Sequence, residues 1–365
     1  MKATMKSLCV IVCWMFAVTE TVIGQDPYFT QYFSTPIYYN PAFTGLGTGL
    51  RARFNYRDQA PRLPVDFKAL YFSADLGDRS LPGAGGLGII VNSDNEGIGF
   101  MKNLVIALTI GVRIPISSYL VSQIGIKAGI LQKTVNWDDF VFTDQLSEKY
   151  GNIYNSDFTP PDADKKIVPD FSAGGILQYS NENSSVFGTV GFAVDHVFEP
   201  DQSFLSTGES RLPRKWIVHT DAVISIGENS SSISRGAGES LKINPGILFI
   251  SQGKLNSIEA GLNLMKFNIY LGGWYKSTIT GTTSNALAVL AGYRYYFAED
   301  MSIKFMYSYD IPISGAMVGT GGAHELSIVL EFANLQIFGG RGGYSSGGGR
   351  QSRRAYDPLD CPVFY

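Results

Sequence analysis

Apolar and polar residues alternate with a period of two along much of the chain. Between residues 51 and 57, Ala52, Phe54 and Tyr56 are apolar and the residues between them are polar. The same alternation covers 122–130, 303–310 and 325–332. Because successive side chains of a β-strand point to opposite faces, each segment predicts a strand with one apolar and one polar face. After residue 24 no segment keeps a helical period of 3.6 residues for long.

Segments of this kind recur at short intervals between turn signals. Charged residues make up only 17% of the chain, and Gly 41, Tyr 20 and Phe 23 are high counts. This composition and pattern predict an all-β fold, a transmembrane antiparallel outer-membrane β-barrel of about 14 strands, an even number as single-chain barrels require. The expected strands are 50–57, 66–75, 83–92, 101–114, 120–133, 168–179, 185–196, 215–226, 241–250, 258–265, 269–276, 286–297, 302–310 and 323–333.

The polar face of the expected strands carries charged side chains near strand centres. Lysine or arginine facing lipid at mid-membrane costs about 2–4 kcal/mol, whereas a polar lumen accepts it. We therefore expect the polar face to point inward. The expected lumen-lining residues are Arg51, Arg53, Arg57, Lys127 and Lys304.

The lengths of the connections support the same topology. If the first strand rises from the periplasm, the odd-numbered connections are extracellular and should be the longer ones. Connections 134–167 and 197–214 are long, whereas 115–119 and 266–268 on the other side are short. The Ser-rich connection 227–240 is long yet falls on the periplasmic side, so it is either an elaborated turn or a wrongly divided strand.

The two ends of the chain differ from the expected barrel. Residues 1–24 resemble a secretory signal peptide, with Lys2 and Lys6 before an apolar run of eleven residues, too short to span a bilayer as a helix. Residues 25–49 form an N-terminal segment leading into the barrel, 50–338 the barrel, and 339–365 a Gly/Ser/Arg-rich linker and periplasmic tail. Cys361 is then the one remaining cysteine, so no disulfide within the chain is expected. The tail is either a solvated extension or a docking segment.

Candidate chemistry is sparse. The three histidines are His196, His219 and His324, and none lies in a metal or nucleophile motif. Asp195 and His196 are adjacent in an expected strand and should point to opposite faces. We therefore predict a protein that is not an enzyme, with no catalytic residue, no cofactor and no metal. A net charge of −3 argues against nucleic-acid binding.

Both ends of the expected barrel carry distinctive segments. Residues 25–45 read QDPYFTQYFSTPIYYNPAFTG, and Tyr307–Phe332 read YSYDIPISGAMVGTGGAHELSIVLEF. These segments resemble the PorP/SprF family of Bacteroidetes outer-membrane proteins, and the resemblance covers about residues 25 to 333. The residues at the motif positions, which we expect to be structural, are Gln25, Asp26, Pro27, Asn40, Pro41, Asp310, His324 and Glu325.

This resemblance implies an integral outer-membrane barrel of fourteen strands that serves type IX secretion and gliding motility. Its partners would be a secreted cargo protein or surface adhesin, or periplasmic ring components of the secretion machinery. The family offers no catalytic residues. Connections 134–167 and 197–214 would form the binding surface. The alternative is a diffusion porin or small-molecule uptake channel, and the sequence leaves open whether the lumen is plugged.

Overall fold

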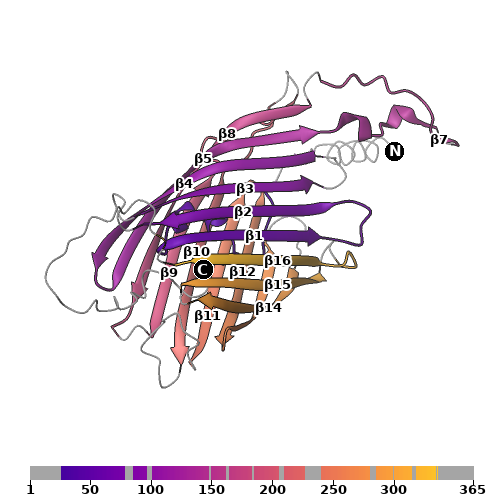
Figure 1. Cartoon of the computed structure of the whole chain (residues 1–365). Helices are drawn as coiled ribbons and strands as arrows, with labels where there is room; N and C mark the ends of the chain where they lie inside the picture. Colours follow the sequence, from indigo (N-terminus) through magenta and orange to yellow (C-terminus); the bar gives the residue numbers. More distant parts are fainter. Residues whose placement is uncertain are drawn as a thin grey trace, which may run out of the picture.

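The alternating segments form a closed antiparallel barrel of fourteen strands (Figure 1). The computed structural model describes residues 26–78, 85–96, 101–147, 149–161, 164–182, 185–204, 209–226, 240–279, 285–298, 300–314, 318–333 and 335. Each strand pairs with its neighbour in the chain, and the first pairs with the last to close the sheet. The predicted fold class and strand number are confirmed. The predicted signal peptide, Gln25, the tail and Cys361 lie outside the described residues.

Most barrel strands are longer than the sequence pattern predicts, but β10 has the predicted bounds, and β9 and β16 are shorter than predicted. The longest is β4 with 17 residues, followed by β5 and β8 with 16 residues each. The barrel strands are β1 Gly49–Gln59, β2 Phe67–Gly77, β3 Gly86–Glu96, β4 Met101–Ser117, β5 Leu120–Val135, β8 Lys165–Ser180, β9 Val186–Asp195, β10 Lys215–Ile226, β11 Leu241–Gln252, β12 Leu255–Lys266, β13 Ile269–Thr278, β14 Asn285–Ala298, β15 Met301–Ser314 and β16 Ala323–Phe332.

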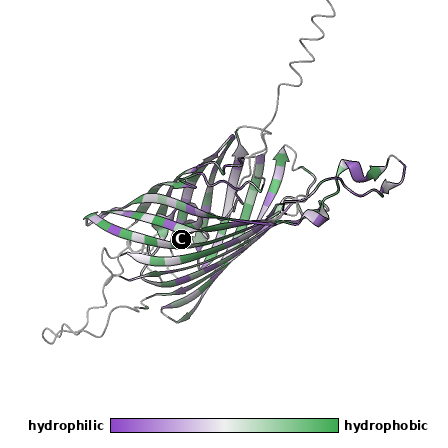
Figure 2. Cartoon of the chain, turned by 90° about the horizontal axis from the view of Figure 1, so that it is seen from above, coloured by the Kyte–Doolittle hydropathy of each residue, from purple (hydrophilic) through white to green (hydrophobic). Residues whose placement is uncertain are grey.

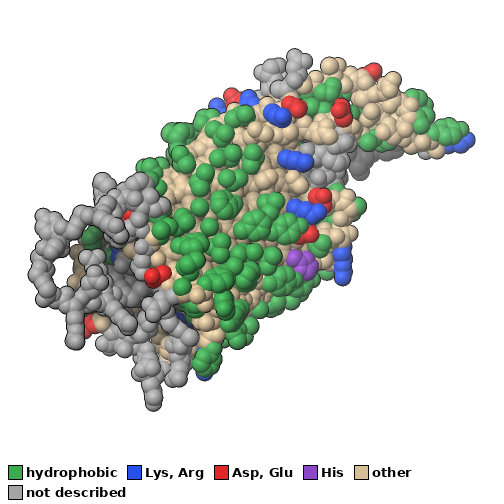
Figure 3. All heavy atoms as spheres, viewed as in Figure 1, with side chains coloured by type: hydrophobic (Ala, Val, Ile, Leu, Met, Phe, Trp, Pro, Cys, Tyr) green, Lys and Arg blue, Asp and Glu red, His purple; other side chains and the backbone are tan. Residues whose placement is uncertain are grey.

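The polar side of the sheet faces inward and the apolar side faces outward. In β1 the polar side chains of Arg51, Arg53 and Asn55 are buried, whereas Phe54 between them is 40% exposed. Figure 2 shows the alternation of apolar and polar residues along the strands, and Figure 3 shows a broad apolar surface over the outside. An apolar exterior around a polar interior is the arrangement of a transmembrane barrel.

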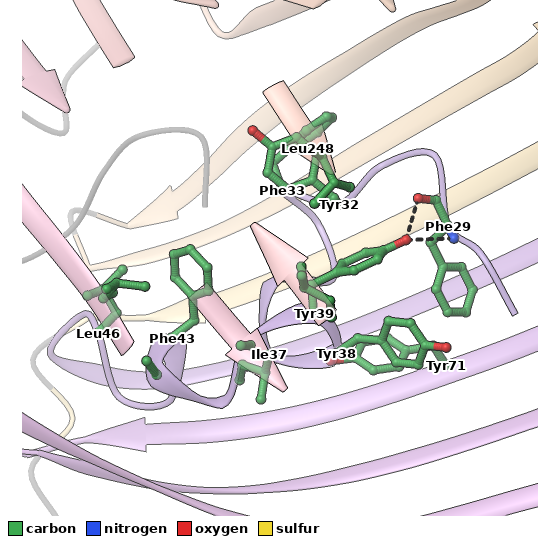
Figure 4. Packing of buried hydrophobic residues seen from close by; sticks show 14 of the residues in the cluster. Phe29, Tyr32, Phe33, Ile37, Tyr38, Tyr39, Phe43, Leu46, Tyr71 and Leu248 are labelled. Carbon is green, nitrogen blue, oxygen red and sulfur yellow. Dashed lines mark hydrogen bonds between the residues drawn. The ribbon is translucent and has the colours of Figure 1, made fainter. Parts of the chain in front are cut away.

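The N-terminal segment fills the lumen. We call residues 26–48 the plug, and the side chains of residues 29–47 are all buried. The plug contains a short helix α2 (Pro36–Tyr39) and a 3-10 turn η1 (Pro41–Phe43), each begun by a proline, which lacks the backbone N–H that a first helical turn leaves unused. Its aromatic residues pack against one another and against wall residues such as Tyr71 and Leu248 (Figure 4). The core of the molecule therefore lies inside the barrel.

The barrel has two unlike rims. The arm rim carries the connections 60–66, 136–164 and 196–214, and the turn rim carries short connections such as 118–119 and 267–268. The plug begins at the arm rim, where the Asp26 amide donates to Gln252 at the end of β11. It ends at the turn rim, where Gly45 packs against Gly86 at the start of β3.

The connection that broke the predicted alternation of lengths lies between two paired strands. β10 and β11 are hydrogen-bonded neighbours, so the sequence pattern divides them correctly. Residues 227–239 of the connection lie outside the described residues. Among the described residues, no helix is long and apolar enough to cross a membrane.

Candidate functional site

Two buried carboxylates of the barrel wall bind the plug at Thr30 and Gln31. Glu325 of β16 accepts hydrogen bonds from the backbone amides of Thr30 (2.7 Å) and Gln31 (3.0 Å). Asp310 of β15 accepts from the Thr30 hydroxyl at 2.8 Å. Arg57 of β1 joins the two carboxylates, donating to Glu325 at 3.1 Å and to Asp310 at 2.9 Å. The plug is thus hydrogen-bonded to two carboxylates that form buried ion pairs within the wall, and such pairs are costly to break one partner at a time.

Asn40 holds the turn in the middle of the plug. Its side-chain oxygen accepts from the backbone amide of Ala42 (2.9 Å), which caps η1, and its amide nitrogen donates to the carbonyl of Gly175 (3.2 Å) on β8. The barrel wall carries glycines where this turn passes. A Cβ added at Gly125 or Gly174 would overlap the backbone of Ala42 or the side chain of Asn40, respectively. Glycine at these two wall positions admits the plug.

A second charged cluster holds the beginning of the plug at the arm rim. Asp26 accepts from Lys215 at 2.7 Å and from His196 Nε2 at 2.8 Å, and His196 Nδ1 donates to Asp170 at 2.8 Å. Burial alone would lower the pKa of His196, but Asp26 and Asp170 outweigh burial and raise this pKa to about 9. Burial likewise opposes ionisation of Asp26, yet His196 and Lys215 hold its pKa well below the ordinary value. At neutral pH Asp26 and His196 are therefore both ionised.

His196 corrects one expectation from the sequence. The residue does not continue β9, which ends at Asp195, because its backbone has a φ of 55° and turns out of the strand. Both side chains are consequently buried in the interior instead of lying on opposite faces. Lys215 contacts two of these carboxylates, and its ammonium lies 3.2 Å from Asp195 and 2.7 Å from Asp26.

The residues expected to line the lumen lie inside the barrel, against the plug or against other charged groups. Arg51 contacts Glu331 at 3.1 Å, Arg53 pairs with Asp75, and Lys127 contacts Asp195 at 3.0 Å. Lys304 is 2% exposed, with its ammonium 6.0 Å from the ring centre of Phe33 in the plug.

All but one of the motif residues in the described part of the chain lie in the plug or contact it; the exception is His324. Asp26, Asn40, Asp310 and Glu325 make the plug contacts described above, and Pro27 and Pro41 lie in the plug itself. His324 lies on the other side of β16 from Glu325. Its ring stacks on Tyr309 at 4.7 Å, and its Nδ1 is 2.7 Å from the Tyr307 hydroxyl.

His219 lies in the interior and also contacts the plug. Its Nε2 is 3.1 Å from Asn40 Nδ2, and its ring stacks on Phe43 at 5.2 Å. These contacts give the residue a packing role. Among the described residues, no group of three or more His, Cys, Asp or Glu side chains is placed to hold a metal ion.

A long connection projects from the arm rim (Figure 1). We call residues 136–161 the arm; it contains the 3-10 turns η4 (Trp137–Asp139) and η5 (Thr143–Gln145) and a hairpin of β6 (Leu146–Ser147) and β7 (Gly151–Asn152). Rings of the arm pack together, with Phe142 and Phe158 centred 4.6 Å apart and Trp137 5.8 Å from Phe158. The Asp144 carboxylate accepts from the Ser156 hydroxyl at 2.8 Å, which ties the two sides of the arm together.

The tip of the arm leaves large apolar side chains in solvent. Tyr150 is 67% exposed, Ile153 53% and Tyr154 56%. Neighbouring aromatic and aliphatic side chains exposed on an ordered element are typical of a binding surface. In the sequence this connection stands out only by its length, because the aromatic cluster that orders it brings together residues that follow no strand or helix period.

Comparison with known proteins assigns the chain to a family. The model of the family described as "Type IX secretion system membrane protein PorP/SprF" matches residues 21–330. A search of curated proteins gave no match.

The chain is also similar in fold to solved barrels. It resembles the CymD monoaromatic hydrocarbon channel (10% identity, 85% of this chain and 93% of that one, TM-score 0.42). It resembles a Pseudomonas aeruginosa FadL homologue (12%, 82% and 92%, TM-score 0.41) and the Acinetobacter baumannii outer-membrane protein Omp33 (8%, 80% and 100%, TM-score 0.39). From the family match and its own closed barrel, the chain is an integral outer-membrane protein that belongs to the PorP/SprF family of type IX secretion system membrane proteins.

Proposed function

We propose that this protein is a non-enzymatic component of type IX secretion that holds a secreted surface protein, such as an adhesin, at the outside of the cell. The observation that carries the proposal is the arm, an ordered element with exposed apolar side chains at one rim of a plugged barrel. In bacterial barrels the longer connections face outward and the short turns face the periplasm. On this basis the arm rim is extracellular, and the turn rim faces the periplasmic secretion components.

The arm has the properties of a preformed binding surface. Because its own aromatic cluster supports it, less conformational entropy is lost on binding than for a loop that must fold around its partner. Tyr150 and Tyr154 offer the large, rigid contact surfaces that dominate many protein interfaces.

The experiment replaces Tyr150, Ile153 and Tyr154 by Ser together and compares surface-attached secreted proteins by mass spectrometry after protease treatment of intact cells. We expect one secreted protein to leave the cell surface and appear in the medium. The matched control is Asn155→Ser in the same arm, which should leave the surface proteins unchanged. An unchanged surface in the triple variant would remove the arm from the proposal.

The alternative function, a diffusion channel, requires the plug to leave the lumen. Residues 29–47 of the plug are buried, and the plug is joined to the wall by the Glu325, Asp310 and Asp26 contacts. Ion conductance in planar bilayers separates the two functions, since a channel conducts steadily and a plugged anchor does not.

A further inference from the structure

A cavity of about 270 Å³ opens at the arm rim beside the beginning of the plug. We call it the mouth pocket. Plug residues Pro27 and Tyr28 contribute to it, and its walls come from the ends of β1 and of the seven strands β10 to β16. The wall residues used below are Gln59, Ile250, Leu255, Ser257, Ala286 and Pro312.

The charged groups of the mouth pocket are paired with one another. Asp310 accepts from Arg57 at 2.9 Å and from Lys276 at 3.0 Å, and Lys215 donates to Asp26 at 2.7 Å. A small ion would have to compete with these buried pairs for every charge it used. The pocket therefore favours an uncharged ligand.

The neutral polar groups of the pocket are less fully hydrogen-bonded than the charged ones. Ser257 is 9% exposed, and its buried hydroxyl oxygen has no hydrogen-bond partner in the described part of the chain. Ser277, Thr278 and the carboxamide of Gln59 add further donors and acceptors around the opening. A buried hydroxyl without a partner is costly, and a ligand that supplies an amide or carbonyl group would satisfy it.

The remaining wall is apolar and has room for a ring. Ile250, Leu255 and Pro312 contribute carbon surface, and the volume exceeds the roughly 150 Å³ of an apolar cavity that binds benzene. A sugar fits less well, because Lys276 Nζ already lies 4.6 Å from the Tyr28 ring centre and the carboxylates are occupied by cations. An extended peptide supplies what the pocket lacks, an apolar side chain between amide groups.

We propose that the mouth pocket binds an aromatic or large aliphatic side chain of an extended peptide segment of the secreted partner. The inference rests on the proposed function for the source of the peptide. The pocket would hold one anchor residue while the arm contacts the folded part of the partner.

The test uses the full-length protein in lipid nanodiscs and acetylated pentapeptide amides that carry phenylalanine, leucine or alanine between glycines. Saturation-transfer NMR should show transfer to the phenylalanine ring and the leucine methyl groups, but not to the alanine peptide. Ala286→Trp fills the pocket and should reduce the signal at least about tenfold. The matched control, Leu287→Trp, lies one residue along β14 with its side chain outside, 46% exposed, and should leave the signal unchanged.

A second variant guards against misfolding. Leu255→Ala removes apolar wall without filling the pocket and should weaken the phenylalanine signal, and heat-modifiable migration on a gel reports whether each barrel is folded. The proposal is overturned if both variants, Ala286→Trp and Leu255→Ala, fold and still show the wild-type saturation transfer to the phenylalanine peptide. Equal transfer to the alanine peptide or to maltotriose, or no transfer to any peptide, would also overturn it.

The two proposals can fail separately. If the arm variant loses the surface protein but no peptide binds the pocket, the proposed function stands and the pocket inference fails. If the peptide binds and the arm variant keeps its surface protein, the pocket is a binding site and the role of the arm is wrong.

Discussion

The plug and the arm are both irregular, aromatic-rich segments, yet they lie in opposite environments. Residues 29–47 of the plug are all buried, whereas Tyr150, Ile153 and Tyr154 of the arm are more than half exposed. The plug is bound to the wall through Glu325 and Asp310, while the arm is ordered by contacts among its own rings. Aromatic content alone therefore does not distinguish a plug from a binding arm. The two differ in whether the barrel wall supplies charged side chains that bind the segment.

The largest expected effect is on the plug side of this comparison. Glu325→Ala leaves Arg57 with one fewer carboxylate and two plug amides without their acceptor. We expect a loss of about 3–5 kcal/mol in unfolding free energy, measured by urea titration in detergent. Glu209→Ala is the control, because this carboxylate is 73% exposed in its pair with Arg211 and should contribute less than about 1 kcal/mol. Equal effects of the two variants would show that the plug contacts do not stabilise the barrel.

The next effect depends on pH. The pKa of His196 is raised to about 9 by Asp26 and Asp170 against burial, so its contribution is complete below its unfolded pKa of about 6.5. That contribution is lost as the pH rises through 9. We expect the stability difference between wild type and His196→Asn, on the order of 2 kcal/mol near pH 6, to shrink toward pH 10. A difference that stays constant over this range would contradict the charged cluster of His196, Asp26, Asp170 and Lys215.

A smaller effect tests the fit of plug and wall. Gly125→Ala places a Cβ against the backbone of Ala42, and we expect a loss of about 1–3 kcal/mol in the same titration. Gly273→Ala is the matched control in β13, where nothing lies within 4 Å of an added Cβ. Similar stabilities of the two variants would mean that the plug does not press on the wall at this turn.

The smallest effect on stability is expected at the arm. The triple Ser variant of Tyr150, Ile153 and Tyr154 should change the unfolding free energy by less than about 0.5 kcal/mol, because these side chains are mostly in solvent. Its consequence should be confined to the surface proteins described above. A loss comparable to that of Glu325→Ala would place the arm among the structural elements.

Much of the barrel is predictable because its physics is local. A period of two gives the strands, and the charged residues on one face give the inside of the barrel, as Arg53 and Phe54 illustrate. The plug is not predictable in this way, since residues 26–48 have no regular period and their contacts join distant positions such as Thr30 and Glu325. The resemblance selected Asn40, Asp310 and Glu325, but their partners follow from the closure of the barrel around the plug. At His196 a single positive φ breaks the strand alternation that the prediction assumed.

The most direct measurement is ion conductance of the purified protein in planar bilayers, compared with a variant that lacks residues 28–44. Most of the plug is then absent, and heat-modifiable gel migration shows whether the barrel still folds. We predict that the wild-type protein is silent and that the folded deletion variant conducts steadily through the emptied lumen. A steady open pore in the wild-type protein would contradict the plugged lumen.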